Sequence, residues 1–137
     1  MPGLLLIAHA PLATALKAVA EHTFPNCASQ LKVLDVGPEM SAEAVEAAAR
    51  ALMQAGGHAE WLLLTDVFGA TPSNAALRLQ SEAVRLVSGV NVPMLWRSLC
   101  YANEPLAALA ERAAQGGHGG VVVADLPVNP NQSPPSQ

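Results

Sequence analysis

The sequence predicts an α/β protein built on a mostly parallel, doubly wound sheet of four strands, with helices on both faces. Short apolar runs alternate about four times with amphipathic helical patterns, which is typical of strands joined by right-handed crossovers. The apolar runs are continuous, as in strands that helices cover on both sides. With 137 residues and 51% hydrophobic content, the chain is long enough to form one domain with a sizeable core.

The first strand and helix are marked by an apolar run and two prolines. Residues 3–8 read GLLLIA, which predicts a buried strand. A helix should follow from Pro11, because apolar side chains recur behind it at helical spacing. Pro25 cannot continue this helix, so we expect it to end near Phe24. Residues 31–36 form the second predicted strand.

The middle of the chain continues the alternation. Ser41 is a suitable cap for a second helix, which should end at the glycine pair of residues 56–57. Residues 61–65 form the third predicted strand. A helix is expected over residues 72–80, because proline is favoured in a first helical turn. The fourth strand is predicted over residues 83–88.

The last third of the chain contains more prolines and glycines. Residues 90–94 should form an apolar loop because they include a proline, with a helical continuation over residues 95–99. Asn103 is a suitable cap for a last amphipathic helix ending at Gly116. A fifth strand is expected over residues 121–124.

The domain should span residues 1–125, and residues 126–137 are rich in proline, which predicts a disordered tail.

Composition excludes several classes of function. The seven lysines and arginines are scattered and the net charge is -4, so no nucleic-acid partner is expected. No apolar run approaches the roughly 18 to 20 residues of a membrane helix, and no secretory signal precedes the first strand. We therefore expect no membrane insertion and a cytoplasmic protein.

Two polar side chains end predicted strands that are usually neighbours in such a sheet. His9 follows the first strand and Asp66 the third, so the two could lie within hydrogen-bonding reach. A carboxylate that accepts one ring N–H fixes the histidine tautomer and leaves the other nitrogen free. That nitrogen could act as a base, a metal ligand or a nucleophile. The simpler interpretation is a structural histidine at a strand end.

The turn after Asp66 is a candidate anion site. Gly69, Ala70 and Thr71 lead into the expected helix, so their amides and the threonine hydroxyl could bind a phosphate. An ordinary capped helix is the alternative. The chain has no phosphate-binding loop of the nucleotide-binding type, and Ser73 lies in no nucleophile elbow.

We also expect no metal and no cofactor. His22, His58 and His118 have no acidic or cysteine neighbours at ligand spacing. Cys27 and Cys100 are isolated, which argues against a disulfide or a metal pair.

Three motifs resemble a known family. They are the first strand ending in His9, residues 66–76 with the sequence DVFGATPSNAA, and residues 89–95 with the sequence GVNVPML. Together they are similar to the IIA component of the mannose family of the bacterial phosphoenolpyruvate-dependent sugar phosphotransferase system. The resemblance spans roughly residues 3–124.

The resemblance implies a cytoplasmic phosphotransferase that carries a phosphoryl group on histidine. His9 would accept the group from the histidine-containing phosphocarrier protein (HPr) and pass it to a histidine or cysteine of a IIB partner. Asp66 would pair with His9, and Gly69, Ala70 and Thr71 would lie at the phosphoryl site. Family members are homodimers that exchange their last, antiparallel strand, which would be residues 121–124 here.

The sequence departs from the family pattern at Ala70, where many members have a second glycine, and at Thr71, where serine is more usual. No family equivalent is evident for residues 96–103 or the proline-rich tail. A regulatory module controlled by phosphorylation of His9, including a dihydroxyacetone-kinase-type input, is an alternative function. A receiver-like domain phosphorylated on Asp66 fits less well, because the acidic residues that hold Mg²⁺ in receivers are absent after the first strand.

Overall fold

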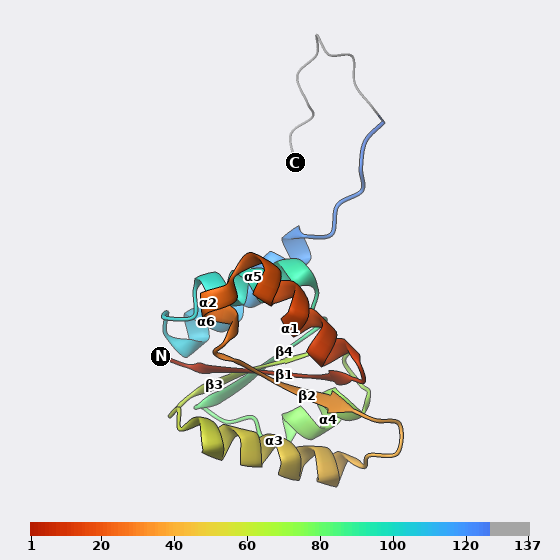
Figure 1. Cartoon of the computed structure of the whole chain (residues 1–137), viewed down its shortest axis with the longest axis vertical. Helices are drawn as coiled ribbons and strands as arrows, with labels where there is room; N and C mark the ends of the chain where they lie inside the picture. The colour runs from red at the N-terminus through yellow and green to blue at the C-terminus, as the bar shows by residue number, and fades with distance from the viewer. Residues whose placement is uncertain (127–137) are drawn as a thin grey trace.

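Four parallel strands form the centre of the protein in the computed structural model, which describes residues 1–126 (Figure 1). They are β1 (Gly3–His9), β2 (Leu31–Val36), β3 (Trp61–Thr65) and β4 (Val84–Ser88), in the order β2-β1-β3-β4. Each neighbouring pair is parallel. The predicted fold class is therefore confirmed. The winding reverses at β1, whose two neighbours are β2 and β3, and ligands of such sheets collect at this point.

Helices cover both faces of the sheet (Figure 1). One face carries α1, α2, α5 and α6, and the other carries α3 and α4. The bounds of these helices are α1 (Leu12–Thr23), α2 (Pro25–Ala28), α3 (Ala42–Gly56), α4 (Thr71–Leu77), α5 (Val92–Cys100) and α6 (Leu106–Gly119).

The two helical layers explain the continuous apolar runs of the central strands. Successive side chains of a strand point to opposite faces, and in β1 and β3 both faces are core. On the α1 side the buried strand residues are Leu4, Leu6, Ala8, Leu62 and Leu64. On the α3 side they are Leu5, Ile7, Trp61 and Leu63.

Caps and prolines set the helix boundaries. Ser41 caps α3 as expected, with its Oγ accepting the N–H of Ala44 at 3.1 Å. The expected loop over residues 90–94 is wrong, because Pro93 lies in the first turn of α5, where a missing N–H is tolerated. Asn91 caps this helix by accepting the N–H of Met94 at 2.9 Å.

Two other helix boundaries also differ from expectation. α4 ends at Leu77 instead of near residue 80. Residue Pro105, not Asn103, stands at the N-cap of α6, which runs through Gly116 to Gly119. Gly116 lies where α6 meets α5, since a Cβ there would be 2.7 Å from the Cβ of Arg97. This glycine therefore serves close helix packing and does not end the helix.

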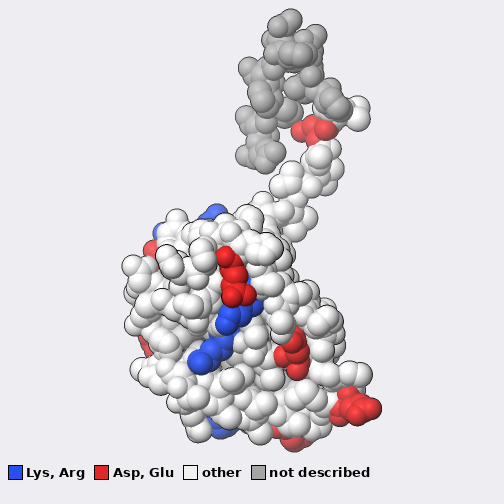
Figure 2. All heavy atoms as spheres, viewed as in Figure 1, with Lys and Arg blue, Asp and Glu red and all other residues white. Residues whose placement is uncertain are grey.

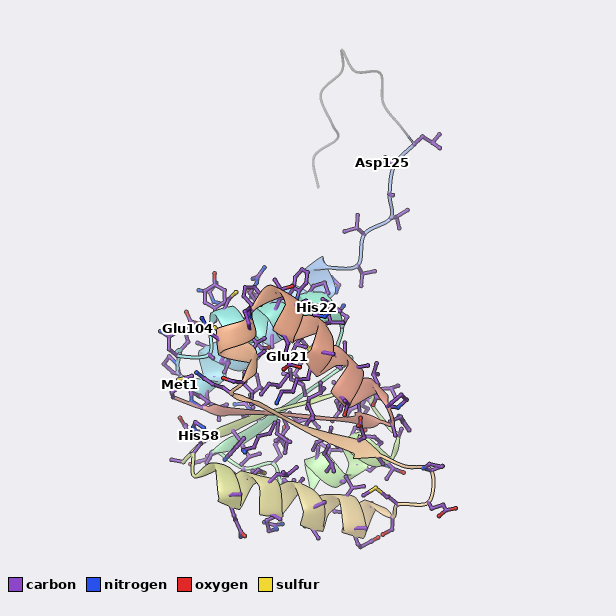
Figure 3. The ribbon with its side chains drawn as sticks, in the orientation of Figure 1. Met1, Glu21, His22, His58, Glu104 and Asp125 are labelled. Carbon is purple, nitrogen blue, oxygen red and sulfur yellow. The ribbon has the colours of Figure 1, made fainter. Side chains whose placement is uncertain are left out.

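The C-terminal segment leaves the body of the protein after α6. Residues 121–126 are exposed and form no strand with the described part of the chain, and Asp125 lies far from the domain (Figure 3). The expected exchange of residues 121–124 into a partner subunit stays a prediction. Of the expected tail over residues 126–137, all but Leu126 lie outside the described residues.

Charged side chains are sparse on the surface that Figure 2 shows. Lys and Arg do not gather there into a continuous basic patch, and acidic residues are interspersed with them. In the described range, no helix is both long enough and apolar enough to cross a membrane.

Candidate functional site

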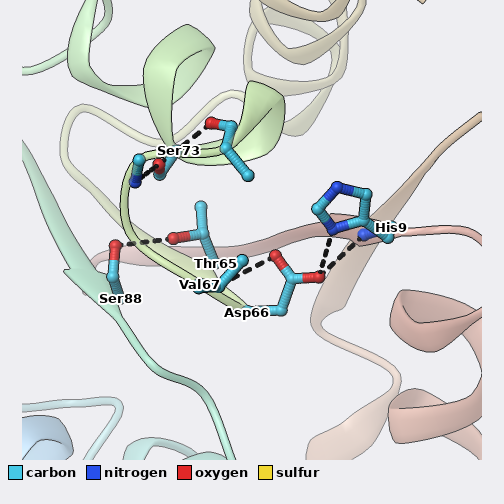
Figure 4. Close-up of polar contacts among 8 residues, drawn as sticks. His9, Thr65, Asp66, Val67, Ser73 and Ser88 are labelled. Carbon is cyan, nitrogen blue, oxygen red and sulfur yellow. Dashed lines mark hydrogen bonds and ion pairs between the residues drawn. The ribbon is translucent and has the colours of Figure 1, made fainter. Parts of the chain in front are cut away.

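The sheet brings His9 and Asp66 together at its carboxyl edge (Figure 4). The ring Nδ1 of His9 lies 2.8 Å from Oδ2 of Asp66, and the backbone N–H of His9 donates to the same oxygen at 3.0 Å. β1 and β3 pair in register up to Ile7 and Thr65. His9 follows that last pair by two residues and Asp66 by one, so both lie just beyond the end of the pairing. The expected approach of the two side chains is thus observed.

Hydrogen bonds favour the ionised form of Asp66. Its burial disfavours the charged carboxylate, but hydrogen bonds from the His9 ring, the His9 amide and the Val67 amide outweigh this cost. The pKa of Asp66 is therefore lowered from its ordinary value. The Val67 amide donates to the second oxygen, Oδ1, at 2.9 Å.

The contact with Asp66 fixes the state of the His9 ring. An ionised carboxylate only accepts hydrogen bonds, so Nδ1 must carry the proton in this pair. The neutral ring then has its lone pair on Nε2, on the side away from Asp66. The side chain of His9 is 51% exposed, compared with 12% for Asp66. The site therefore presents an oriented imidazole nitrogen to solvent.

The loop after Asp66 is held by a serine that sequence reasoning set aside. Ser73 is fully buried; its Oγ accepts the N–H of Gly69 at 2.8 Å and donates to the carbonyl of Ala70 at 3.1 Å (Figure 4). Gly69 has a φ of 94°, which favours glycine. The serine follows the glycine by four residues, but no sequence signal shows that it turns back onto the loop.

The hydrogen bond from Gly69 to Ser73 makes the three residues of the expected anion site unequal. The amide of Gly69 is engaged by Ser73. The amides of Ala70 and Thr71 donate to no acceptor in residues 1–126. Thr71 is half-buried at the first position of α4. Ala70 and Thr71 are therefore better placed than Gly69 to offer an amide to a ligand.

A second pair of polar side chains, one buried and one half-buried, supports the same edge of the sheet. Thr65 Oγ1 and Ser88 Oγ are 2.7 Å apart and join the ends of β3 and β4 (Figure 4). The carbonyl of Thr65 accepts the amides of Gly89 and Val90, both at 2.9 Å. This keeps the chain rigid immediately before Asp66.

Exposed apolar side chains lie close in sequence to His9 and to Asp66. Leu12, at the start of α1, is 38% exposed, and Val67 and Phe68, in the Asp66 loop, are 49% and 68% exposed. Large exposed apolar side chains near a functional group are typical of protein contact sites.

The remaining histidines lie elsewhere. His22 is in the last turn of α1 and His118 in that of α6. His58 packs against Trp61 and lies near the N-terminus, with its Nδ1 3.0 Å from the carbonyl of Met1 (Figure 3). In residues 1–126, no group of three or more His, Cys, Asp or Glu side chains could hold a metal ion.

Comparison with known proteins places these features in one family. The profile of the family described as the PTS system fructose IIA component (EIIA-man) matches residues 3–114. The match runs through residues 96–103, for which no family equivalent was evident from the motifs. No match was found among curated proteins.

Several solved structures share this fold, among them components of phosphotransferase systems. The mannose/sorbose specific IIA subunit from Enterococcus faecalis is 25% identical, with a TM-score of 0.86 over 93% of this chain and 98% of that chain. Component EIIA from Streptococcus agalactiae is 22% identical, with a TM-score of 0.79 over 90% and 97%. A sigma-54 interaction domain protein from Enterococcus faecalis shares the fold at 12% identity, with a TM-score of 0.70 over 86% and 91%.

Proposed function

The chain belongs to the mannose-type family of IIA components of the sugar phosphotransferase system, and on this premise we propose that it carries a phosphoryl group on His9. Membership of the family gives it a phosphotransfer role in that system. The finer proposal is that His9 accepts the group from HPr and passes it to a IIB protein. One observation carries it: the 2.8 Å contact between His9 Nδ1 and Asp66 Oδ2, which leaves Nε2 as the free nitrogen.

In the proposed step the Nε2 lone pair attacks the phosphorus of a phosphohistidine on the donor. The new bond joins His9 Nε2 to phosphorus, and the bond from phosphorus to the donor nitrogen breaks and returns its electron pair to that nitrogen. Positive charge develops on the His9 ring, and the Asp66 carboxylate stabilises it through Nδ1–H. Because one N–P bond replaces another, alignment of the groups is the main requirement of catalysis.

The phosphoryl oxygens need donors beside Nε2. We assign this role to the amides of Ala70 and Thr71 and to the Thr71 hydroxyl. The amide of Gly69 contributes less, because Ser73 already accepts its hydrogen bond. Ser73 instead acts by holding the loop, which lowers the cost of organising donors during transfer.

Partner proteins would dock on the apolar side chains around His9. Leu12, Val67 and Phe68 are exposed on the two segments that flank the histidine. Burying them would add apolar area to the contact, with His9 facing the partner's reacting group. A donor and an acceptor could use the same surface in turn, since transfer requires that each leaves before the other binds.

The test is incubation with phosphoenolpyruvate, enzyme I and HPr, followed by addition of candidate IIB proteins. We expect label on His9 that is stable in alkali, is lost in acid, and passes to a IIB protein. His9→Ala should abolish labelling, whereas the matched control His22→Ala should be labelled like the wild type. Labelling that persists in His9→Ala would overturn the proposal, and an alkali-labile label would point to the receiver-like alternative on Asp66.

A second candidate function is a regulatory module whose partner responds to phosphorylation of His9. The fold shared with a sigma-54 interaction domain protein supports this regulatory module as a candidate. A dihydroxyacetone-kinase-type input would be a function of the same regulatory kind. Label that enters His9 but reaches no IIB protein would support this module over the carrier.

We also propose a homodimer formed by exchange of residues 121–124. β4 is an edge strand of the sheet, and such an edge can accept a further strand. Val121 and Val123 are 76% and 92% exposed in the single chain, so pairing with a partner would remove apolar surface from water.

A further inference from the structure

A carboxylate on β2 contacts the first turn of the helix that follows His9. The N–H of Thr14 donates to Oδ1 of Asp35 at 3.1 Å, and the Thr14 hydroxyl donates to Oδ2. Thr14 is the third residue of α1, and the residue at the N-cap, Pro11, makes no side-chain cap. Asp35 therefore caps α1 from a neighbouring strand, with its charge at the favourable end of the helix.

The same strand also holds the turn between His9 and α1. His9 pairs with Val36 in the register of β1 and β2, and the N–H of Ala10 donates to the carbonyl of Val36 at 2.9 Å. Only Ala10 and Pro11 separate His9 from Leu12, the first residue of α1. The last two residues of β2 thus fix both ends of this short turn.

His9 is consequently held from two sides. Asp66, after β3, binds its ring and its amide, while Asp35 and Val36, at the end of β2, bind the residues that follow it. A ring that turns about a mobile backbone would lose its alignment even if its contact with Asp66 were kept. Displacements of about 1 Å can cost roughly 100-fold in rate.

We propose that Asp35 is a positioning residue for phosphoryl transfer at His9, acting through its two hydrogen bonds to Thr14; this inference rests on the proposed phosphocarrier function. Asp35 holds the start of α1, and the start of α1 holds the backbone from which His9 projects. Asp35 contacts no reacting atom, so its effect reaches the chemistry only through this path.

The first test is single-turnover transfer from saturating phosphorylated HPr. We expect Asp35→Ala to lower the rate roughly 10- to 100-fold, with a matched exposed carboxylate control, Glu39→Ala, at the wild-type rate. Thr14→Val should also lower the rate, because it removes the hydroxyl donor. Thr14→Ser keeps that donor and should restore the rate. The double variant Asp35→Ala/Thr14→Val should be no slower than Asp35→Ala, since both changes break one interaction.

The second test reads the histidine without any phosphoryl donor. Nitrogen NMR of the His9 ring and hydrogen exchange of the Thr14 amide should both change in Asp35→Ala and stay as in the wild type in Glu39→Ala. Wild-type protein that takes no label on His9 would overturn the proposed function, and these signals would still decide whether Asp35 positions the ring. Wild-type rates and ring signals in both Asp35→Ala and Thr14→Val would overturn the positioning role. If Asp35→Ala does not fold, the Thr14→Val and Thr14→Ser pair decides the question.

Discussion

The Asp66 carboxylate receives two hydrogen bonds from one residue, the ring and the backbone amide of His9. A single oxygen, Oδ2, accepts both, so the orientation of the ring is tied to the end of β1. The other oxygen accepts the amide of the following residue, Val67. Each of these donors stabilises the anion, and the anion in turn determines which nitrogen of His9 is free.

Replacing Asp66 should therefore slow transfer without unfolding the protein. We expect Asp66→Ala to lower the rate of phosphoryl transfer to His9 by about 100-fold, because the ring loses its orientation and its partner for positive charge. The rate can be followed by rapid quench with labelled HPr. Asp125→Ala, on the exposed C-terminal segment, is the matched control. An unchanged rate in Asp66→Ala would contradict the pairing as a functional one.

The lowered pKa of Asp66 makes a prediction about stability in acid. A group whose pKa is lower in the folded than in the unfolded state stabilises the fold above its unfolded pKa, and this contribution is lost as pH falls through the folded pKa. Asp66 belongs to this case. The difference in free energy of unfolding between the wild type and Asp66→Asn should thus be largest near neutral pH and shrink below about pH 4. Urea unfolding across this range measures it, and a constant difference would argue against a lowered pKa of Asp66 in the folded protein.

At the scale of single elements, the strands were more predictable than the helix ends. Continuous apolar runs mark buried strands directly, because both faces of β1 and β3 are core. Proline and glycine were misleading signals: Pro93 lies in the first turn of α5, and α6 continues through Gly116. Proline is tolerated in a first helical turn, so Pro93 fits the helix that Asn91 caps. At Gly116 the close approach of α5 decides, and the local sequence does not show it. The roles of Ser73 and Asp35 were not predicted. Each side chain accepts a backbone N–H, and a sequence motif does not show which amide a side chain will contact.

The packing of α6 against α5 gives a prediction at this scale. A Cβ at Gly116 would lie 2.7 Å from the Cβ of Arg97, too close for the two helices to keep their distance. We expect Gly116→Ala to lower the free energy of unfolding by about 1 to 3 kcal/mol. Gly119→Ala is the control, because a Cβ there meets no atom within 4 Å; it should be neutral or stabilising by up to about 1 kcal/mol. Urea unfolding of both variants makes the comparison, and equal effects would show that close packing is not the reason for Gly116.

For the whole molecule, the sequence predicts the topology of the sheet more completely than it predicts the details of the site. Alternating strands and helices, with right-handed crossovers, leave few arrangements, and the observed one brings the ends of β1 and β3 together. Because these two strand ends are neighbours, the contact between His9 and Asp66 could be predicted although the two residues are far apart in the sequence. Residues 121–124 are different, because the strand that we propose for them would pair with another subunit and would have no partner within its own chain to define it.

The proposed exchange of this segment can be tested with one substitution in the full chain. Val122 is 54% exposed in the single chain, so replacing it should not disturb the domain. Val122→Pro removes a backbone N–H and a ladder hydrogen bond, and we expect it to convert the dimer to a monomer while the far-ultraviolet circular dichroism is kept. Val122→Thr retains both the N–H and the β-branched shape, so it should remain dimeric. Light scattering coupled to size exclusion measures the mass at matched concentrations. If the proline variant is as dimeric as the threonine variant, subunits associate through another surface, and the free edge of β4 must be protected in some other way.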